Sequence, residues 1–196
     1  MTQRMTQDEV LAALKAADAI RHGHFVLTSG RHSDTYVQCA RILENPELTT
    51  QLARGAVAGL ADDANIDLVV APAVGGIIIG FAIAQALGVK FIFTEREQGR
   101  MTLRRSFHVP EGARVLVVED VVTTGGSVAE VVDVVRAAGA EVVGAVALID
   151  RGGEKAFDVP LWPLLRLEVE SWEPASCVQC LSGTAVDSPG SRRLSS

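Results

Sequence analysis

The sequence predicts one α/β domain, in which a parallel sheet is flanked by helices and a small hood is formed by the two chain ends. Short apolar stretches alternate with amphipathic stretches of about a dozen residues, which is the pattern of βαβ units. Aromatic residues are only 5% of the chain, so the core is built from Val, Ala, Leu and Ile, as in buried parallel sheets. The length of 196 residues suits a single domain.

The N-terminal region predicts two helices separated by a hairpin. Thr6-Gln-Asp-Glu9, followed by apolar residues at helical spacing, is typical of a capped amphipathic helix. Residues 25–28 and 35–38 flank the turn Ser29-Gly30-Arg31 and predict a small β-hairpin. Asn45 followed by Pro46 predicts the start of a helix that ends near residue 60.

The remaining elements predict the sheet and its covering helices. Expected strands cover residues 66–71, 90–93, 114–118 and 142–149, and expected helices cover residues 77–87 and 127–138. We expect a single domain over residues 1–181, with the hood formed by about residues 1–40 and 160–181. Residues 182–196 are rich in Ser, Gly and Pro and predict a flexible tail.

Charge and composition exclude several classes of partner. The net charge is −6, with 18 basic and 24 acidic residues, so we expect neither nucleic acid nor a membrane surface as a partner. Residues 68–89 carry no charge, but Pro72 and four glycines interrupt them, which favours a strand, a loop and a helix over a membrane span. With no apolar leader at the N-terminus and only three cysteines, a cytoplasmic location is expected.

The run Val115-Leu-Val-Val-Glu-Asp-Val-Val-Thr-Thr-Gly-Gly-Ser127 is the strongest functional signal. An apolar strand ends in two carboxylates, and a loop of small residues then leads into a helix. Glycines allow close approach of the backbone, and the unpaired amides of a first helical turn bind phosphate. Glu119 and Asp120 would repel a phosphate, so they are expected to accept from ribose hydroxyls or to hold a divalent cation. A ribose 5-phosphate satisfies both requirements.

An ordinary strand-to-helix turn capped by Ser127 is an alternative interpretation of the Gly-Gly pair. The run is neither a Walker loop nor a Rossmann fingerprint, because the Gly-Lys-Ser/Thr and Gly-x-Gly-x-x-Gly patterns are missing. A second signal is the polar segment 94–110, whose four arginines interrupt the core strands and predict an active-site flap.

These residues carry a family resemblance. The run that ends at Ser127 resembles the phosphoribosyl pyrophosphate motif of type I phosphoribosyltransferases. Four further segments, Leu27–Tyr36, Ala71–Gly76, Phe93–Arg96 and Leu148–Arg151, resemble the orotate branch of that family, in a form with a short catalytic loop. The resemblance implies the type I phosphoribosyltransferase fold and transfer of 5-phosphoribosyl from phosphoribosyl pyrophosphate to orotate, with Mg²⁺, in a homodimer. A purine phosphoribosyltransferase and a non-catalytic sensor of phosphoribosyl pyrophosphate are the alternatives.

The resemblance also implies roles for individual residues. Thr123 and Arg151 would bind orotate, and Arg100, Arg104 and Asp120 are the expected catalytic residues. The family often has Lys where Gly75 stands and lysines in the loop that holds Arg100 and Arg104, so these arginines are the expected replacements or else a solvated face. No side chain is assigned as a ligand of a resident metal. Phosphoribosyl pyrophosphate would contact Ala73, Val74, Gly75, Arg96, Glu119, Asp120, Val121, Val122, Thr123, Thr124, Gly125, Gly126 and Ser127.

The pair Cys177-Val-Gln-Cys180 is half of a metal or redox motif. With only Cys39 left, one chain cannot supply four cysteines, so a zinc ion bridged between two chains, a disulfide or free thiols all remain open. His22, His24, His32 and His108 are interpreted as surface or hood residues without metal partners. Trp162 and Trp172 are expected to pack a terminal strand against the core.

Overall fold

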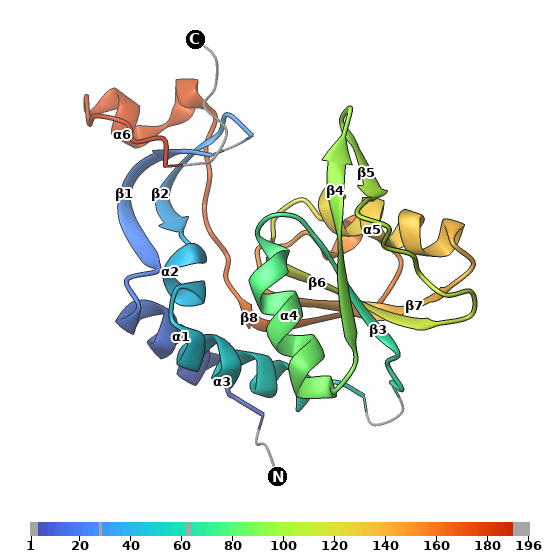
Figure 1. Ribbon diagram of the computed structural model, residues 1–196. Coiled ribbons are helices and arrows are strands. Elements are labelled where there is room, and N and C mark those ends of the chain that lie inside the picture. The colour runs from blue at the N-terminus through green and yellow to red at the C-terminus, as the bar shows by residue number, and fades with distance from the viewer. Residues whose placement is uncertain (1–3, 28, 62–63, 190–196) are drawn as a thin grey trace.

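The computed structural model describes residues 4–27, 29–61 and 64–189 (Figure 1). Its centre is a six-stranded sheet with the strand order β5-β4-β3-β6-β7-β8. All neighbouring pairs are parallel except β4 and β5, which form an antiparallel pair. The predicted parallel sheet is confirmed. The strands are β3 (Leu68–Pro72), β4 (Lys90–Glu97), β5 (Arg100–Leu103), β6 (Arg114–Val122), β7 (Glu141–Asp150) and β8 (Leu161–Arg166).

Helices cover both faces of the sheet. The helices are α1 (Gln7–Ala16), the short α2 (Ala40–Leu43), α3 (Pro46–Val57), α4 (Gly76–Leu87) and α5 (Gly126–Ala137). Alternate residues of β6 divide between the two layers. Leu116 and Val118 belong to the apolar cluster that includes α1, α3 and α4, whereas Val115 and Val117 belong to the cluster that includes α5. Because both faces are buried, the strand is apolar throughout and not alternating.

The caps predicted from sequence are present at the N-terminal helices. The Thr6 side chain accepts from the Glu9 amide while the Glu9 carboxylate accepts from the Thr6 amide, at 3.3 and 2.8 Å. Asn45 Oδ1 accepts from the Leu48 amide at 3.0 Å, with Pro46 in the first turn. Such caps each stabilise a helix by about 1 kcal/mol.

The hood differs from its expected boundaries. It contains the antiparallel hairpin β1 (Ile20–Val26) and β2 (His32–Val37), together with the single-turn helix η2 (Pro174–Ser176) and α6 (Val178–Leu181). Residues 161–166 do not belong to it, because they form β8, a parallel partner of β7 in the main sheet. A side chain at Gly144 of β7 would lie 2.3 Å from the Trp162 ring, so Trp162 packs directly on that glycine.

The C-terminal segment returns to the N-terminal hairpin (Figure 1). The backbone amides of Trp172 and His32 each donate to the other residue's carbonyl at 2.8 Å. The Asp187 amide donates to the His24 carbonyl at 2.7 Å, and the Asp187 carbonyl accepts from the Val26 amide at 2.9 Å. Hydrogen bonds of the hood therefore extend beyond residue 181, into the segment expected to be a flexible tail. Residues 190–196 of that segment lie outside the described residues.

The uncharged stretch 68–89 divides as the sequence predicts. β3 takes its first part, a turn follows, and α4 takes the rest with only 12 residues. Among the described residues, no helix has the length and apolarity that crossing a membrane requires.

Candidate active site

The predicted phosphate loop lies between β6 and α5, at the carboxyl edge of the sheet. Gly125 is the N-cap of α5 with φ +76°, and no side chain caps the helix. The interpretation of a turn capped by Ser127 is therefore wrong, because Ser127 lies inside the helix. The first-turn amides are left as donors, at the end of the helix where the dipole favours an anion.

The loop is held in place by a close backbone contact. A Cβ atom at Gly125 would lie 2.2 Å from the Gly153 carbonyl oxygen, and one at Gly153 would lie 2.7 Å from the Thr123 carbonyl oxygen. Next to it, Gly126 has open space, with Thr124 Oγ1 as the nearest neighbour at 3.9 Å. Gly125 therefore packs closely against the backbone of Gly153, whereas Gly126 leaves open space at the N-terminus of α5.

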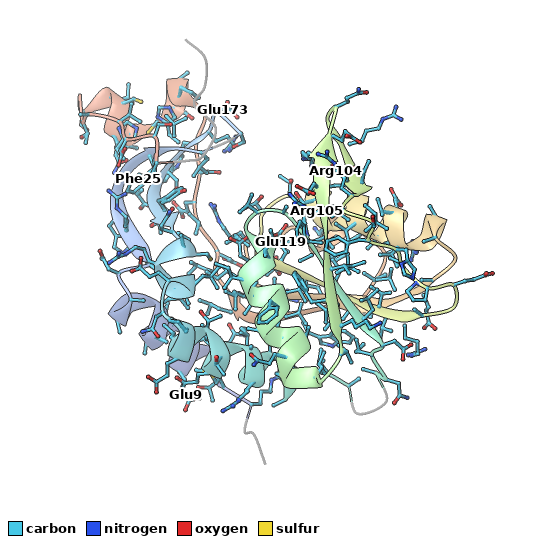
Figure 2. The ribbon with its side chains drawn as sticks, viewed as in Figure 1. Glu9, Phe25, Arg104, Arg105, Glu119 and Glu173 are labelled. Atoms are coloured by element: carbon cyan, nitrogen blue, oxygen red, sulfur yellow. The ribbon has the colours of Figure 1, made fainter. Side chains whose placement is uncertain are left out.

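Glu119 and Asp120 lie at the end of β6, where Figure 2 shows Glu119 between the hood, marked by Phe25 and Glu173, and the β4–β5 hairpin. Burial raises the pKa of Glu119 well above its ordinary value, and the neighbouring Asp120 raises it further. Burial also raises the pKa of Asp120, although hydrogen bonds from Glu119 and from the Val121 amide at 2.8 Å oppose the rise. Two desolvated carboxyl groups side by side favour a partner that donates hydrogen bonds or brings positive charge.

Asp120 also reaches the turn that follows β3. A Cβ atom at Gly75 would lie 2.7 Å from both carboxylate oxygens of Asp120. A side chain at position 75 would therefore displace the Asp120 carboxylate. The Ala73 amide donates to the Thr94 carbonyl at 2.8 Å and anchors the turn to β4. The structure therefore brings the turn 73–75 next to Asp120, and a shared contact with phosphoribosyl pyrophosphate stays a prediction.

Arg151 follows β7 beside the phosphate loop. Its amide donates to the Val122 carbonyl at 2.8 Å, whereas its side-chain Nε is buried and has no partner among the described residues. Burial lowers the pKa of the Arg151 guanidinium, and the Tyr36 side chain acts in the opposite direction. The Asp150 carboxylate accepts from the amides of Gly152 and Gly153, at 2.8 and 3.2 Å.

The predicted flap is a β-hairpin formed by β4 and β5. Gln98 and Gly99 at its tip have φ values of +50° and +85°, the signs of a two-residue type I′ turn. Arg104 and Arg105 follow β5 and lie beside this hairpin in Figure 2. Arg104 pairs with Glu97 at 3.6 Å, and Arg105 pairs with Glu95 at 2.9 Å. Arg100 is exposed, and no ion pair of Arg100 is found in the described part of the chain.

Arg96 has a partner that the sequence did not suggest. Its guanidinium makes two hydrogen bonds to the Glu130 carboxylate of α5, at 2.9 and 2.7 Å. Glu130 also accepts from the Met101 amide at 3.3 Å and so ties β5 to α5. The contact of Arg96 with a leaving group stays a prediction, and it requires this ion pair to open.

Sequence reasoning also missed a hood residue that faces the site. Burial raises the pKa of Tyr36, and the charges acting on it include Asp120 and Arg151. Its position within the motif Leu27–Tyr36 was the available signal. A cavity of about 690 Å³ lies elsewhere, beside α1 and α3, and is lined by Glu9, Glu47 and their neighbours.

Comparison with known proteins places these features in a family. The model of the phosphoribosyl transferase domain matches residues 39–162. Orotate phosphoribosyltransferase of Heliobacterium modesticaldum is 50% identical over 96% of this chain and 100% of its own length. Its counterpart from Acidithiobacillus ferrooxidans is 49% identical over 97% of this chain and 100% of its own length. The chain belongs to the orotate phosphoribosyltransferases.

Solved structures agree with this membership. Orotate phosphoribosyltransferase from Aeropyrum pernix has a TM-score of 0.70 and 30% identity, over 81% of this chain and 93% of that chain. The Mycobacterium tuberculosis orotate phosphoribosyltransferase in complex with inorganic phosphate has a TM-score of 0.66 and 27% identity, over 82% of this chain and 95% of that chain. An adenine phosphoribosyltransferase from Thermoanaerobacter pseudethanolicus, at 20% identity and a TM-score of 0.61, shares the fold.

Proposed function

We propose that the chain transfers 5-phosphoribosyl from phosphoribosyl pyrophosphate to N1 of orotate, giving orotidine 5′-phosphate and pyrophosphate. The observation that carries this proposal is Arg151, whose buried Nε has no partner among the described residues and lies next to the phosphate loop. Orotate bears a carboxylate, which a guanidinium binds with paired hydrogen bonds. A purine base lacks this group.

The phosphate loop supplies the binding site for the 5′-phosphate. The uncapped first turn of α5, together with the hydroxyl groups of Thr123, Thr124 and Ser127, offers donors to its oxygens. Glu119 and Asp120 then accept from the ribose 2′- and 3′-hydroxyls. These hydrogen bonds favour the ionised carboxylates and offset the effect of burial on their pKa values.

The pyrophosphate would leave on the side of the turn 73–75. The carboxylate oxygens of Asp120 beside this turn fit the preference of Mg²⁺ for hard oxygen ligands. When bound with phosphoribosyl pyrophosphate, Mg²⁺ supplies positive charge that stabilises the departing pyrophosphate. Arg100 and Arg104 of the β4–β5 hairpin provide further cations once the hairpin closes, and Arg96 joins them if its pair with Glu130 opens.

The reaction needs no protein nucleophile. The C1–oxygen bond to pyrophosphate breaks, N1 of orotate forms the new bond to C1, and the N1 proton is lost. The residues hold both reactants in line and keep competing water out while charge develops on the ribose.

The test is the loss of orotate absorbance in the presence of phosphoribosyl pyrophosphate and Mg²⁺, with hypoxanthine, xanthine, adenine and uracil assayed in parallel. Turnover of orotate alone supports the proposal. Turnover of a purine instead would refute the role of Arg151 and favour the purine alternative. Binding of phosphoribosyl pyrophosphate without turnover of any base would favour the sensor.

We further propose a homodimer with a cytoplasmic location. Val74, Ile78 and Phe81 are 81%, 51% and 59% exposed and lie on or next to α4, so an apolar surface is available to a second copy. None of the three cysteines forms a disulfide, which agrees with a reducing compartment. Light scattering of the protein and of Phe81→Glu tests the dimer, because the charge should shift the protein toward monomer.

A further inference from the structure

Four side chains with metal-binding atoms meet in the hood, away from the proposed active site. His24 comes from β1 and His32 from the start of β2, whereas Cys177 is the N-cap of α6 and Cys180 lies within that helix. Their ligand atoms all lie within 4.8 Å of one another. We propose that this cluster binds one Zn²⁺ ion, which fastens the C-terminal segment to the N-terminal hairpin.

The distances match the size of a tetrahedral site. Zinc bonds of about 2.0–2.1 Å to nitrogen and about 2.3 Å to sulfur place neighbouring N and S ligands about 3.5 Å apart. His24 Nε2 lies 3.4 Å from Cys177 Sγ and 3.6 Å from Cys180 Sγ, and His32 Nδ1 lies 3.2 Å from Cys180 Sγ. The two imidazole nitrogens are 2.8 Å apart, shorter than the roughly 3.4 Å of a tetrahedron. Zinc binding would therefore move these two nitrogens about 0.6 Å apart.

The protein fixes the orientation of one ligand from behind. His24 Nδ1 lies 2.8 Å from the Thr184 carbonyl, which can only accept, so Nδ1 carries the proton and donates. With the proton on Nδ1, Nε2 is the nitrogen available to bind a metal, and it faces His32 and the two sulfur atoms. A histidine that donates its second nitrogen to a carbonyl in this way is typical of zinc sites.

The set and its burial favour a metal over a polar cluster. His24, His32 and Cys177 are 4%, 8% and 0% exposed, so three of the four groups have left water. Two thiols and two imidazoles in a tetrahedron suit zinc, and the four-ligand set is closed, as in structural sites. The cysteines are not joined in a disulfide.

This arrangement corrects the sequence-based interpretation of these residues. The histidines were not expected to have metal partners, and a complete site was expected to need a second chain. The hairpin brings His24 and His32 to Cys177 and Cys180, so one chain supplies all four ligands. The pairings of Trp172 with His32 and of Asp187 with His24 hold the two segments together on either side of the cluster.

The decisive experiment is metal analysis of untagged protein purified without chelators. We expect about one zinc per chain, and after exchange Co²⁺ should give the intense visible bands of a tetrahedral site together with sulfur-to-cobalt charge transfer. Cys180→Ser and His32→Asn should lose most of the zinc, whereas Cys39→Ala and His108→Asn, which change the same residue types outside the cluster, should retain it.

Several results would overturn the proposal. Zinc well below one equivalent in wild-type protein with both thiols reactive would do so, as would a mass lower by two hydrogens, which indicates a disulfide. Zinc content that Cys180→Ser leaves unchanged would place the ion elsewhere. If the variants fail to fold, the wild-type stoichiometry and the cobalt spectrum still decide the question, and neither depends on the orotate reaction.

Discussion

Substituting each of the two adjacent glycines of the phosphate loop with alanine separates fold from function. Gly125 has φ +76°, and a Cβ atom there would lie 2.2 Å from the Gly153 carbonyl oxygen. The left-handed conformation costs an alanine about 1–2 kcal/mol, and overpacking adds about 1–3 kcal/mol. Gly125→Ala should therefore lower the free energy of unfolding by about 2–5 kcal/mol. At about 2–4 °C per kcal/mol for a chain of this size, the loss is easily measured as a change in Tm.

Gly126→Ala is the matched control, because its Cβ atom has open space in the free protein. Stability should be unchanged or rise by up to about 1 kcal/mol, since alanine restricts the unfolded chain. The KM for phosphoribosyl pyrophosphate should nevertheless rise about tenfold or more, equivalent to about 1.4 kcal/mol, because the methyl group occupies the space expected for the phosphate. Urea unfolding and initial rates measure the two effects. An unchanged KM in Gly126→Ala would refute the placement of the phosphate, and wild-type stability in Gly125→Ala would refute the close backbone contact.

Three further substitutions test the charged residues of the site. Asp120→Asn should lower kcat/KM by about 10- to 150-fold, because it weakens a hydrogen bond to a charged group, while the Tm is retained. Wild-type turnover would contradict the contact of Asp120 with ribose. Arg151→Ala should raise the KM for orotate about tenfold or more and leave that for phosphoribosyl pyrophosphate nearly unchanged, so equal effects on both would remove its role. Because the pKa of Glu119 is raised in the folded state, wild-type stability falls as pH rises from the ordinary value of 4.5 through the raised pKa. A glutamine cannot ionise, so the stability of Glu119→Gln does not fall in this way. The Tm of the variant minus that of wild type should therefore be larger at pH 8 than at pH 5. A difference that decreases as pH rises would contradict the burial of Glu119.

The phosphate loop could be predicted because its signal is local. Strand, carboxylates, glycines and helix follow one another within residues 115–138, and each element depends on neighbours a few positions away. The β4–β5 hairpin carried a comparable signal in Gln98-Gly99, but the arginines around it were interpreted as a flap. The expected hood includes residues 160–181, whereas the place of β8 in the main sheet depends on its pairing with β7.

The zinc ligands show where sequence reasoning reached its limit. His24 and Cys177 are separated by 153 positions, and no local pattern links them. The bulge in β1 between His22 and Phe25 and the return of the C-terminal segment decide that they meet. The partner of Arg96 could not be predicted either. Glu130 is one of several charged residues on α5, and only the position of β5 beside α5 selects it.

The hood affects the order in which parts of the molecule can fold during synthesis. Its hairpin precedes the main sheet in the chain, yet its partners at residues 172–187 follow that sheet. The sheet between them, from β3 to β8, can assemble during translation before the hood closes, because the hood closes only when residues 172–187 have emerged from the ribosome. Closing so long a loop is slow and entropically costly, and a shared metal ion would hold the two ends together once they have met. Deletion of the fifteen residues 174–188 would leave every strand of the main sheet intact, because β8 ends at Arg166. The same deletion would remove both cysteines of the cluster.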